Sequence, residues 1–150
     1  MSSKKVLREG PIPATMVGEV VAKHEAKTHL GGHQIFLGTV RADDSSAGKV
    51  AGIDYSAYAE MAEKEFAKIR ESAFEKYELG CMHMYHSTGL VKVGEISLFV
   101  MISAPHRKEL SEASSWIVEQ IKTKVPIWKE EHLENGNTRW IGEAKTKDHA

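Results

Sequence analysis

The stretch CMHMYHSTGLVKVGEISLFVMISAP, residues 81–105, holds two strand-like segments, one directly after the other. These segments cover residues 81–86 and 95–102, and Gly89 and Gly94 provide turn residues between them. Two strands in succession, with no helix between them, break the strand–helix alternation of a doubly wound parallel sheet. The stretch therefore favours an α+β fold.

Helices are expected on both sides of this strand pair. Residues 60–77 form an amphipathic pattern, with Lys and Glu opposite a rough apolar stripe. That stripe comprises Met61, Phe66, Ile69, Ala73 and Phe74. After the strands, Pro105 suits the first position of a helix that Pro126 ends. The apolar positions of this second helix are Leu110, Ala113, Ile117 and Ile121.

With the segments before residue 60 and after residue 126, the expected order of elements is α-β-β-α-β-β-α-(β-β). This order does not alternate strictly, so it also favours an α+β fold. The further expected elements are a helix over residues 14–26, strands over 34–41 and 50–58, and short strands at Trp128 and over 139–143. Residues 43–48 indicate a solvated, mobile loop. Residues 1–12 are expected to form a flexible lead-in, and residues 13–145 a single domain.

The composition excludes several classes of protein. The 150 residues are 41% hydrophobic and 27% charged, which is ordinary for one folded domain. Lys and Arg number 20 and Asp and Glu number 21, so the formal net charge is −1. A general nucleic-acid binder usually has a basic domain, so no nucleic-acid partner is expected. An anionic ligand must instead be held by a local cluster of cations.

The compartment is inferred from the cysteine count and from the apolar runs. Cys81 is the single cysteine, so no internal disulfide can form and a reducing compartment is the simpler interpretation. No apolar signal-peptide core follows the polar residues 1–10. The longest nearly apolar stretch, residues 96–105, has about half the length needed to cross a bilayer. We expect a soluble, cytoplasmic protein with no membrane partner.

The eight histidines form no recognisable metal motif. His29 and His33, and likewise His83 and His86, have suggestive spacings, but residues three apart on a strand face opposite sides. Ordinary strand and loop histidines are the simpler interpretation, so neither a metal nor a cofactor is expected. Cys81 is expected to be a small core residue, because nothing near it in the sequence activates a thiol.

Two basic clusters are candidate anion sites. Residues 38–41, Gly-Thr-Val-Arg, place a cation at the end of a strand, although a solvated arginine is the alternative. Residues 106–108, His-Arg-Lys, would lie on the first turn of a helix, where the helix dipole disfavours cations. Such a broken local rule is typical of functional sites, and an arginine at helix-start amides could cradle a phosphate. Three solvated side chains remain the alternative for this cluster.

The third cluster is residues 122–131, Lys-Thr-Lys-Val-Pro-Ile-Trp-Lys-Glu-Glu. Lysines in a last helical turn usually serve as capping cations, which is the simplest interpretation. However, residues 126–128 form an apolar patch that could desolvate Lys122 or Lys129. Desolvation lowers the pKa of a lysine and turns it into a base or a nucleophile. The cluster is therefore a candidate catalytic site.

Together the three clusters resemble the large, catalytic subunit of molybdopterin synthase. The matching segments span roughly residues 33–143 and follow the order of that family. They are FLGTVR (36–41), YSAYAEMA (55–62), His86 with Gly89 and VGE (93–95), SAPHR (103–107), Lys122 with VPIWKE (125–130), and Arg139-Trp140. Ser87 departs from the family, since many members have arginine there, and this weakens any role for residues 86–89.

The resemblance implies a fold, a reaction and an assembly. The fold is an α/β hammerhead-like α+β domain with additional antiparallel strands. The activity is a sulfurtransferase: a small ubiquitin-like carrier subunit brings sulfur as a thiocarboxylate on its C-terminal glycine. Two sulfurs pass in turn to cyclic pyranopterin monophosphate and form the dithiolene of molybdopterin. The large subunit forms a homodimer, which binds two carriers and so becomes a heterotetramer.

The resemblance also implies the site residues. Lys122 and Lys129 correspond to the two active-site lysines of the family. The expected substrate-binding residues and their neighbours in the pocket are Thr39, Val40, Arg41, His106, Arg107, Glu130, Glu131 and Arg139. We hypothesise that Lys122 has the chemical role, as acid–base or nucleophile, and that Lys129 grips the carrier tail or the substrate.

Helix geometry predicts that this site is shared between two subunits. If one helix runs from His106 past Lys122, then Arg107 and Lys122 are 15 residues apart. At ~1.5 Å per residue that is roughly 22 Å, which a small pterin cannot easily span. We therefore expect Arg41, Lys122 and Lys129 of one subunit to meet His106 and Arg107 of the other. The alternative function is a non-catalytic anion-binding or scaffold subunit of a sulfur-carrier complex, which would not need both lysines.

Overall fold

The structure is a computed structural model and describes residues 5–141. Its elements are β1 (Leu7–Glu9), α1 (Ala14–Lys23), η1 (His24–Ala26), β2 (Gly32–Thr39), β3 (Asp44–Ser45), β4 (Gly48–Ala57), α2 (Ala59–Lys76), β5 (Cys81–Lys92), β6 (Ile96–Ala104), η2 (Arg107–Glu109), α3 (Leu110–Lys124), β7 (Ile127–Leu133) and β8 (Thr138–Trp140). Within these residues the strands form one eight-stranded sheet in the order β2-β6-β5-β4-β7-β8, with β1 on β5 and β3 on β4. All of these pairs are antiparallel except β1 with β5. The predicted α+β class is confirmed.

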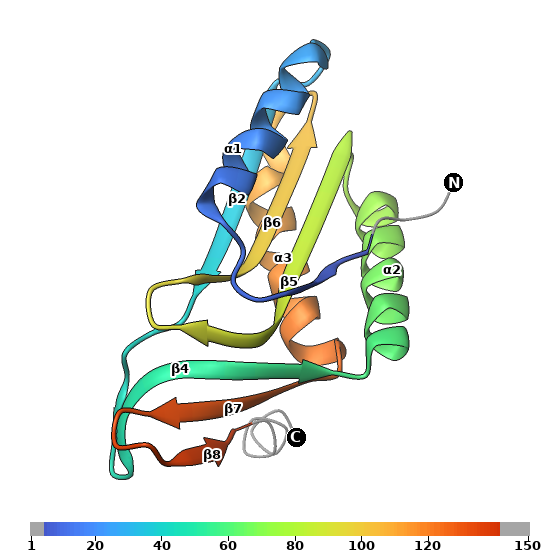
Figure 1. Cartoon of the computed structure of the whole chain (residues 1–150). Helices are drawn as coiled ribbons and strands as arrows, with labels where there is room; N and C mark the ends of the chain where they lie inside the picture. Colours follow the sequence, from blue (N-terminus) through green and yellow to red (C-terminus); the bar gives the residue numbers. More distant parts are fainter. Residues whose placement is uncertain (1–4, 142–150) are drawn as a thin grey trace.

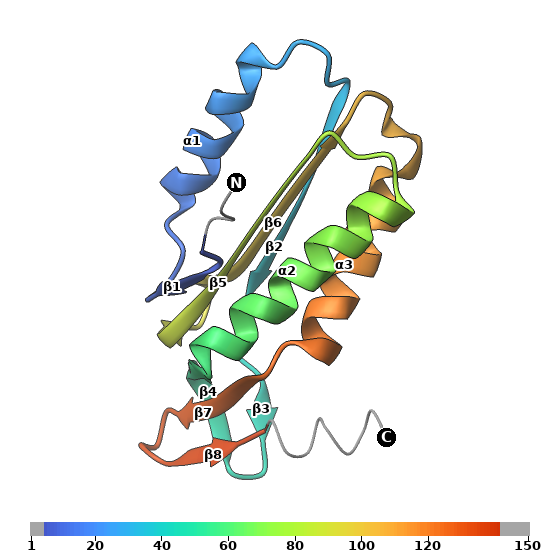
Figure 2. The same cartoon turned by 90° about the vertical axis from the view of Figure 1, so that its right-hand side faces the viewer.

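The helices cover both faces of the sheet, with α1 on one face and α2 and α3 on the other (Figure 2). Met82 and Met84 of β5 face α2 and α3, whereas Tyr85 of β5 faces α1. The buried apolar residues of the two longer helices are Ala62, Phe66, Ile69 and Ala73 in α2, and Leu110, Ala113, Ile117 and Ile121 in α3. The stripe of α3 is as predicted, but Met61 of the expected α2 stripe is exposed because Ala62 faces the sheet instead.

Strand β5 joins two parts of the sheet through a bend. Residues 81–86 pair with β6, and residues 89–92 pair with β4. Gly89 lies at the change of partner with a φ of 84°, which glycine adopts without a side-chain clash. The sequence predicted a turn at Gly89, but the strand bends there and continues to Lys92. As a result β4 and β7 run across the ends of β2 and β6 (Figure 1).

The N-terminal segment differs from the expected flexible lead-in. Val6 and Ile12 are buried, and β1 pairs in parallel with residues 86–88 of β5. There β5 changes partner, so β1 satisfies backbone groups that would otherwise stay unpaired. A carboxylate of α2, that of Glu63, also accepts hydrogen bonds from two backbone amides of this segment. The expectation is therefore wrong for residues 6–12, while residues 1–4 and 142–150 lie outside the described part of the chain.

The helix expected to begin at Pro105 begins later. β6 continues to Ala104, which pairs with Gly32 of β2 and holds the chain extended. Residues 107–109 then form one 3-10 turn, and α3 starts at Leu110. The basic residues 106–108 therefore precede the α-helix and do not occupy its first turn, so the predicted cradle of helix amides is not formed by α3.

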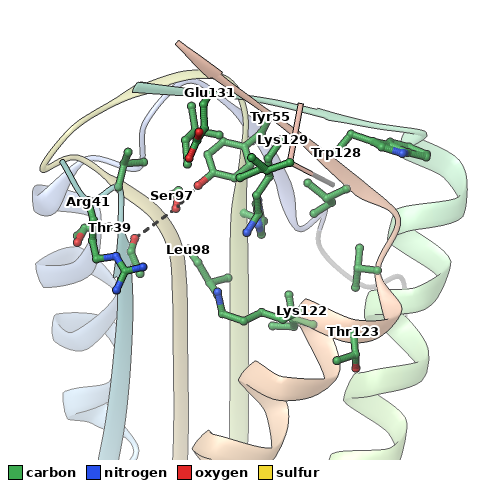
Figure 3. A pocket seen from close by; sticks show the side chains of 18 of the residues that line it. Thr39, Arg41, Tyr55, Ser97, Leu98, Lys122, Thr123, Trp128, Lys129 and Glu131 are labelled. Atoms are coloured by element: carbon green, nitrogen blue, oxygen red, sulfur yellow. Dashed lines mark hydrogen bonds between the residues drawn. The ribbon is translucent and has the colours of Figure 1, made fainter. Parts of the chain in front are cut away.

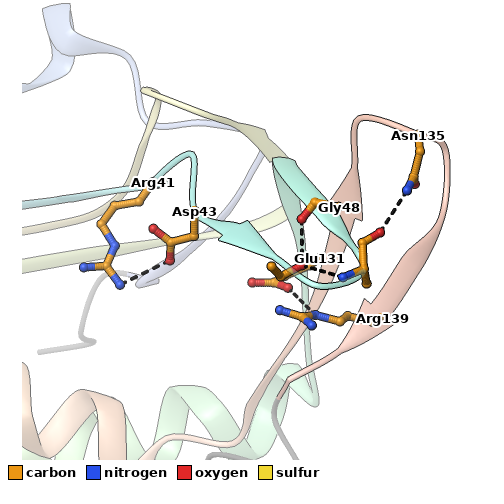
Figure 4. Close-up of polar contacts among 8 residues, drawn as sticks. Arg41, Asp43, Gly48, Glu131, Asn135 and Arg139 are labelled. Atoms are coloured by element: carbon orange, nitrogen blue, oxygen red, sulfur yellow. Dashed lines mark hydrogen bonds and ion pairs between the residues drawn. The ribbon is translucent and has the colours of Figure 1, made fainter.

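The expected loop over residues 43–48 is exposed, but it is a tight hairpin. Asp44 and Ser45 form β3 and pair with Lys49 and Gly48 of β4. The hydroxyl of Ser45 donates to the carbonyl of Gly48 at 2.6 Å (Figure 4). The side-chain amide of Asn135 donates to the backbone carbonyl of Ala47 at 2.8 Å, and this contact connects the hairpin to the turn between β7 and β8. The segment therefore has a specific structure next to Arg41.

Candidate active site

A cavity of about 820 Å³ lies where β4 and β7 cross the ends of β2 and β6 (Figure 3). The last turn of α3 closes its lower side in this view. Six of the residues expected from the sequence line it: Thr39, Val40, Arg41, Lys122, Lys129 and Glu131. The fold thus brings together, from three separate elements, most of the residues of the first and third basic clusters.

Three cationic side chains of this cavity come from different elements (Figure 3). Arg41 follows β2, Lys122 lies in the last turn of α3, and Lys129 lies on β7. The C-terminal end of a helix favours a cation, so the position of Lys122 costs little. Arg41 contacts Asp43 at 3.3 Å, but its side chain is 82% exposed, and such a surface pair contributes at most about 1 kcal/mol. Lys124 also lines the cavity, as do the carboxylates of Asp43 and Glu131, so an anion there would meet four positive charges and two negative ones.

The two lysines have different surroundings. Lys122 is exposed, whereas Lys129 is half-buried. The apolar patch of residues 126–128 lines the same cavity, but the indole of Trp128 remains 47% exposed. Desolvation by this patch therefore applies more to Lys129, which is held on a strand, than to Lys122, which extends from the end of a helix.

A buried histidine, His86, also lines the cavity. Burial lowers its pKa from 6.5 to about 4; the hydrogen bond to the backbone of Ser87 opposes this effect, and the charges of Lys129 and Lys122 add to it. Its Nδ1 donates to the carbonyl of Ser87 at 2.9 Å, so Nε2 is left as an acceptor. His86 is therefore neutral at pH 7. As predicted, it faces the opposite side of β5 from His83.

The polar wall beside His86 consists of Tyr55 and Ser97. The ring of Tyr55 lies edge-on to that of His86, with centroids 5.2 Å apart. Its hydroxyl donates to the Ser97 hydroxyl at 3.2 Å, and Ser97 donates to the carbonyl of Gly38 at 3.4 Å (Figure 3). Burial raises the pKa of Tyr55, against the opposing effect of the bond to Ser97, so the phenol stays neutral.

Sequence reasoning missed these three wall residues. Tyr55 and His86 occur in matched segments, but the arginine missing at position 87 directed attention away from residues 86–89. Ser97 lies in an ordinary strand pattern with no local signal. The contacts among them depend on the change of partner along β5, which only the folded chain reveals.

Of three further predicted site residues, Glu130, Glu131 and Arg139, only Glu131 lines the cavity. Glu131 is buried in the cavity wall and accepts a hydrogen bond from Arg139 Nε at 2.7 Å (Figure 4). Arg139 is therefore one contact away from the cavity. Glu130 points to the other face of β7, near Asp54 and His132, because neighbouring strand residues alternate. The expectation that Glu130 lines the same pocket is wrong for this reason.

His106 and Arg107 lie in a different, more open pocket of about 470 Å³. Its other lining residues are Gly31, Pro105 and Lys108. This pocket is at the beginning of α3, whereas Lys122 is at the end of that helix. A single copy of the chain therefore does not bring His106 and Arg107 to the lysines of the larger cavity.

The sequence matches the family described as MoaE protein over residues 9–124. Among curated relatives, the molybdopterin synthase catalytic subunit of Pyrococcus abyssi is 42% identical over 116 residues, 77% of each chain. The protein of the same name from Halalkalibacterium halodurans is 33% identical over 144 residues, covering 95% of this chain and 88% of its own. The human one is 38% identical over 112 residues, covering 75% and 58% of the two chains.

Solved structures agree with these relatives. Molybdopterin synthase from Staphylococcus aureus superposes with a TM-score of 0.79 at 28% identity, over 95% of this chain and 99% of the other. A chain from the complex of subunits 1 and 2 of molybdopterin-converting factor from Helicobacter pylori has the same fold, with a TM-score of 0.76 at 23% identity over 92% and 91%. The family match, the close relatives and the shared fold together place this chain in the MoaE protein family.

Proposed function

We propose that this chain is the catalytic subunit of a molybdopterin synthase. It would transfer sulfur from the C-terminal thiocarboxylate of a small carrier subunit to cyclic pyranopterin monophosphate. The observation that carries this proposal is the convergence of Arg41, Lys122 and Lys129 on one cavity. The relatives from Pyrococcus abyssi and human that bear the name of this subunit support the assignment.

The charge of the cavity suits the proposed reactants. A thiocarboxylate tail and a phosphate are both anions, and clustered cations stabilise them without making the whole surface basic. His86 and Tyr55 are neutral, so they offer hydrogen-bonding groups that add no opposing charge. Each transfer would form a carbon–sulfur bond at the pterin, where an oxygen substituent leaves, and water would hydrolyse the carbon–sulfur bond at the carrier's terminal carbonyl, which leaves the carrier with a carboxylate.

The surroundings of the two lysines support different roles. Lys122 reaches across the cavity from the end of α3 (Figure 3), where its long side chain can follow a reacting carbonyl and move a proton. Lys129 is half-buried on β7, where a fixed ammonium can hold an anionic tail or substrate. We therefore assign the chemical step to Lys122 and the grip to Lys129.

The pocket that contains His106 and Arg107 can contribute to this reaction only from a second copy of the chain. His106 and Arg107 lie just before α3, and a 3-10 turn and most of that helix separate Arg107 from Lys122, which is roughly 22 Å for 15 residues at ~1.5 Å each. We propose a homodimer in which these two residues reach the larger cavity of the partner subunit and hold the substrate phosphate. With one carrier at each cavity the assembly would be a heterotetramer.

The proposed place of action is the cytoplasm, where the single cysteine would stay reduced. In residues 5–141 no helix is long and apolar enough to span a membrane.

The experiment that tests the function uses the full chain, a thiocarboxylated carrier and cyclic pyranopterin monophosphate. The dithiolene product is measured by mass spectrometry, and carrier binding is measured separately by analytical ultracentrifugation. Product that depends on this chain is the expected result. A carrier that binds without any product would instead indicate a scaffold subunit, and a carrier that does not bind would overturn the assignment.

A further inference from the structure

A cluster of two histidines and one cysteine lies where α1 ends and β5 begins. Figure 1 shows that these element ends are at the opposite end of the sheet from β4 and β7, which border the candidate active site. Nε2 or Nδ1 of His24 and His83 and Sγ of Cys81 all lie within 4.8 Å of one another. The two Nε2 atoms are 3.0 Å apart, and the rings are edge-on with centroids separated by 4.7 Å. His24 and Cys81 are buried, and His83 is half-buried. The proposed sulfur transfer uses none of these residues.

The fold assembles this cluster from two distant segments. Cys81 and His83 begin β5 and, being two residues apart, both face the side of the sheet that α1 covers. His24 follows the last turn of α1 and begins η1, directly over that end of the sheet. The sequence pairs His83 with His86 and His29 with His33, so the spacing of the histidines gave no sign of the contact between His24 and His83.

The ring of His24 is already oriented as a ligand. Its Nδ1 lies 2.7 Å from the carbonyl of Val20, and a carbonyl can only accept, so this nitrogen carries the proton. The lone pair of His24 is therefore on Nε2, which faces His83. A carbonyl that holds the distal nitrogen of an imidazole in this way is a common support of metal-binding histidines, because it sets the tautomer and the ring orientation.

We propose that His24, Cys81 and His83 bind one divalent transition-metal ion of the zinc type. Two imidazole nitrogens and a thiolate are ligands that zinc favours. Two nitrogens at about 2.0–2.1 Å from a tetrahedral ion are about 3.3 Å apart, so the observed 3.0 Å requires only a small shift. Binding would release the thiol proton to solvent and move the proton on His83 from Nε2 to Nδ1. A water would take the fourth position.

Lys27 provides a charge that opposes the ion. Its ammonium lies 3.1 Å from the sulfur of Cys81. The positive charge of Lys27 would repel a metal ion bound to Cys81. However, Lys27 is exposed, so its side chain can turn away into solvent. Replacement of Lys27 by methionine removes the charge and keeps the length of the side chain. The proposal therefore predicts that Lys27→Met binds the ion more tightly than the natural chain.

The site would connect α1 to β5. Helix α1 otherwise packs on the sheet through an apolar cluster that includes Val20, Tyr85, Phe99 and Met101. An ion shared by His24 and the two β5 ligands would add a second attachment at the end of that helix. Because the ion would bind only the folded chain, it should raise the unfolding temperature in proportion to its occupancy.

The test is a titration of the metal-free full chain with Co²⁺, followed by absorption spectroscopy, and with Zn²⁺, followed by thermal unfolding. We expect one ion per chain, thiolate-to-cobalt charge-transfer absorption and the visible bands of a tetrahedral site. Cys81→Ser should abolish the charge-transfer band, and His83→Gln should weaken binding at least tenfold. His29→Gln, which changes an exposed histidine outside the cluster, should bind as the natural chain does.

Other outcomes would overturn the proposal. They are the absence of saturable binding, binding that Cys81→Ser leaves unchanged, and equal loss in His29→Gln. Circular dichroism shows whether each variant is folded. If Cys81→Ser does not fold, the charge-transfer band of the natural chain and the loss in His83→Gln decide the question. Activity of the chain is not a readout, so failure here is separate from failure of the proposed function.

Discussion

Glu131 of β7 accepts a hydrogen bond of 2.7 Å from Arg139 Nε of β8, directly across the two strands. Glu131 is buried in the wall of the cavity, whereas the side chain of Arg139 is 41% exposed. The arginine therefore compensates a negative charge that would otherwise face the anions proposed to bind there. Arg139 acts on the cavity through Glu131 and is a positioning residue.

Removal of this arginine should destabilise the chain and weaken anion binding. Arg139→Gln leaves the Glu131 carboxylate without its charged donor, and after allowance for the partial exposure of Arg139 we expect a loss of about 1 kcal/mol in the free energy of unfolding. Denaturant unfolding measures it, and a double-mutant cycle with Glu131→Gln isolates the pair. Arg41→Gln is the control, because its pair with Asp43 is more exposed than the pair of Arg139 with Glu131 and should contribute less. A coupling energy of zero would contradict the prediction.

His86 should make folding sensitive to acid. Its pKa is 6.5 in an unfolded chain and about 4 in the folded one, because burial disfavours the charged ring. Between these values, as the pH falls, the unfolded chain takes up a proton that the folded chain does not. The contribution of His86 is therefore complete above pH 6.5 and is lost progressively toward pH 4, by up to about 1.4 kcal/mol per pH unit and about 3 kcal/mol in total.

The measurement is the free energy of unfolding at pH 7 and at pH 4.5, for the natural chain and for His86→Gln. The variant should lose less stability between the two pH values, and the difference isolates His86 from the carboxylates that titrate in both proteins. Equal pH dependence in His86→Gln and the natural chain would refute the assignment.

The sequence was sufficient for the fold class because its signals were local. Two successive strands and the i, i+3, i+7 and i+11 stripe of α3 both depend on residues that are near one another in the sequence. Errors arose where distant segments decided the structure. β1 depends on the open stretch of β5 at residues 86–88, and the continuation of β6 to Ala104 depends on pairing with β2.

For the candidate site too, the features that depend on local sequence were predicted, and those that depend on distant segments were not. Lysines beside an apolar run and an arginine after a strand are visible in the sequence, and they meet in the cavity. Burial lowers the pKa of His86, and the sequence does not show which residues are buried. The contacts of Arg139 with Glu131 and of His24 with His83 join segments that only the folded chain brings together. The prediction that Glu130 lines the cavity was wrong because neighbouring residues of a strand point to opposite faces of the sheet. A residue next to a site residue in the sequence therefore faces away from the site.

The two lysines should fail in different ways when replaced. Lys122→Ala should lower the single-turnover rate of sulfur transfer about 10²- to 10⁴-fold, the usual contribution of general acid–base catalysis, with carrier affinity nearly unchanged. Lys129→Ala should weaken carrier or substrate binding about tenfold or more through the loss of a charge-assisted hydrogen bond. Lys68→Ala, an exposed lysine on α2, is the control. If Lys122→Ala keeps its rate and Lys129→Ala loses it, the roles are reversed.

The composite site predicts rescue between inactive subunits. Arg107→Ala and Lys122→Ala should each be inactive alone, but after subunit exchange a mixed dimer contains one cavity with Lys122 and the partner's intact Arg107. Random mixing makes half of the dimers mixed, with one working site of two, so about a quarter of the natural activity should return. Lys122→Ala mixed with Lys129→Ala is the matched control: both residues lie in one cavity of one chain, so the mixture should show no more activity than the two variants give separately. Exchange is verified by native mass spectrometry. Rescue in both mixtures, or in neither, would show that Arg107 does not complete the partner's cavity.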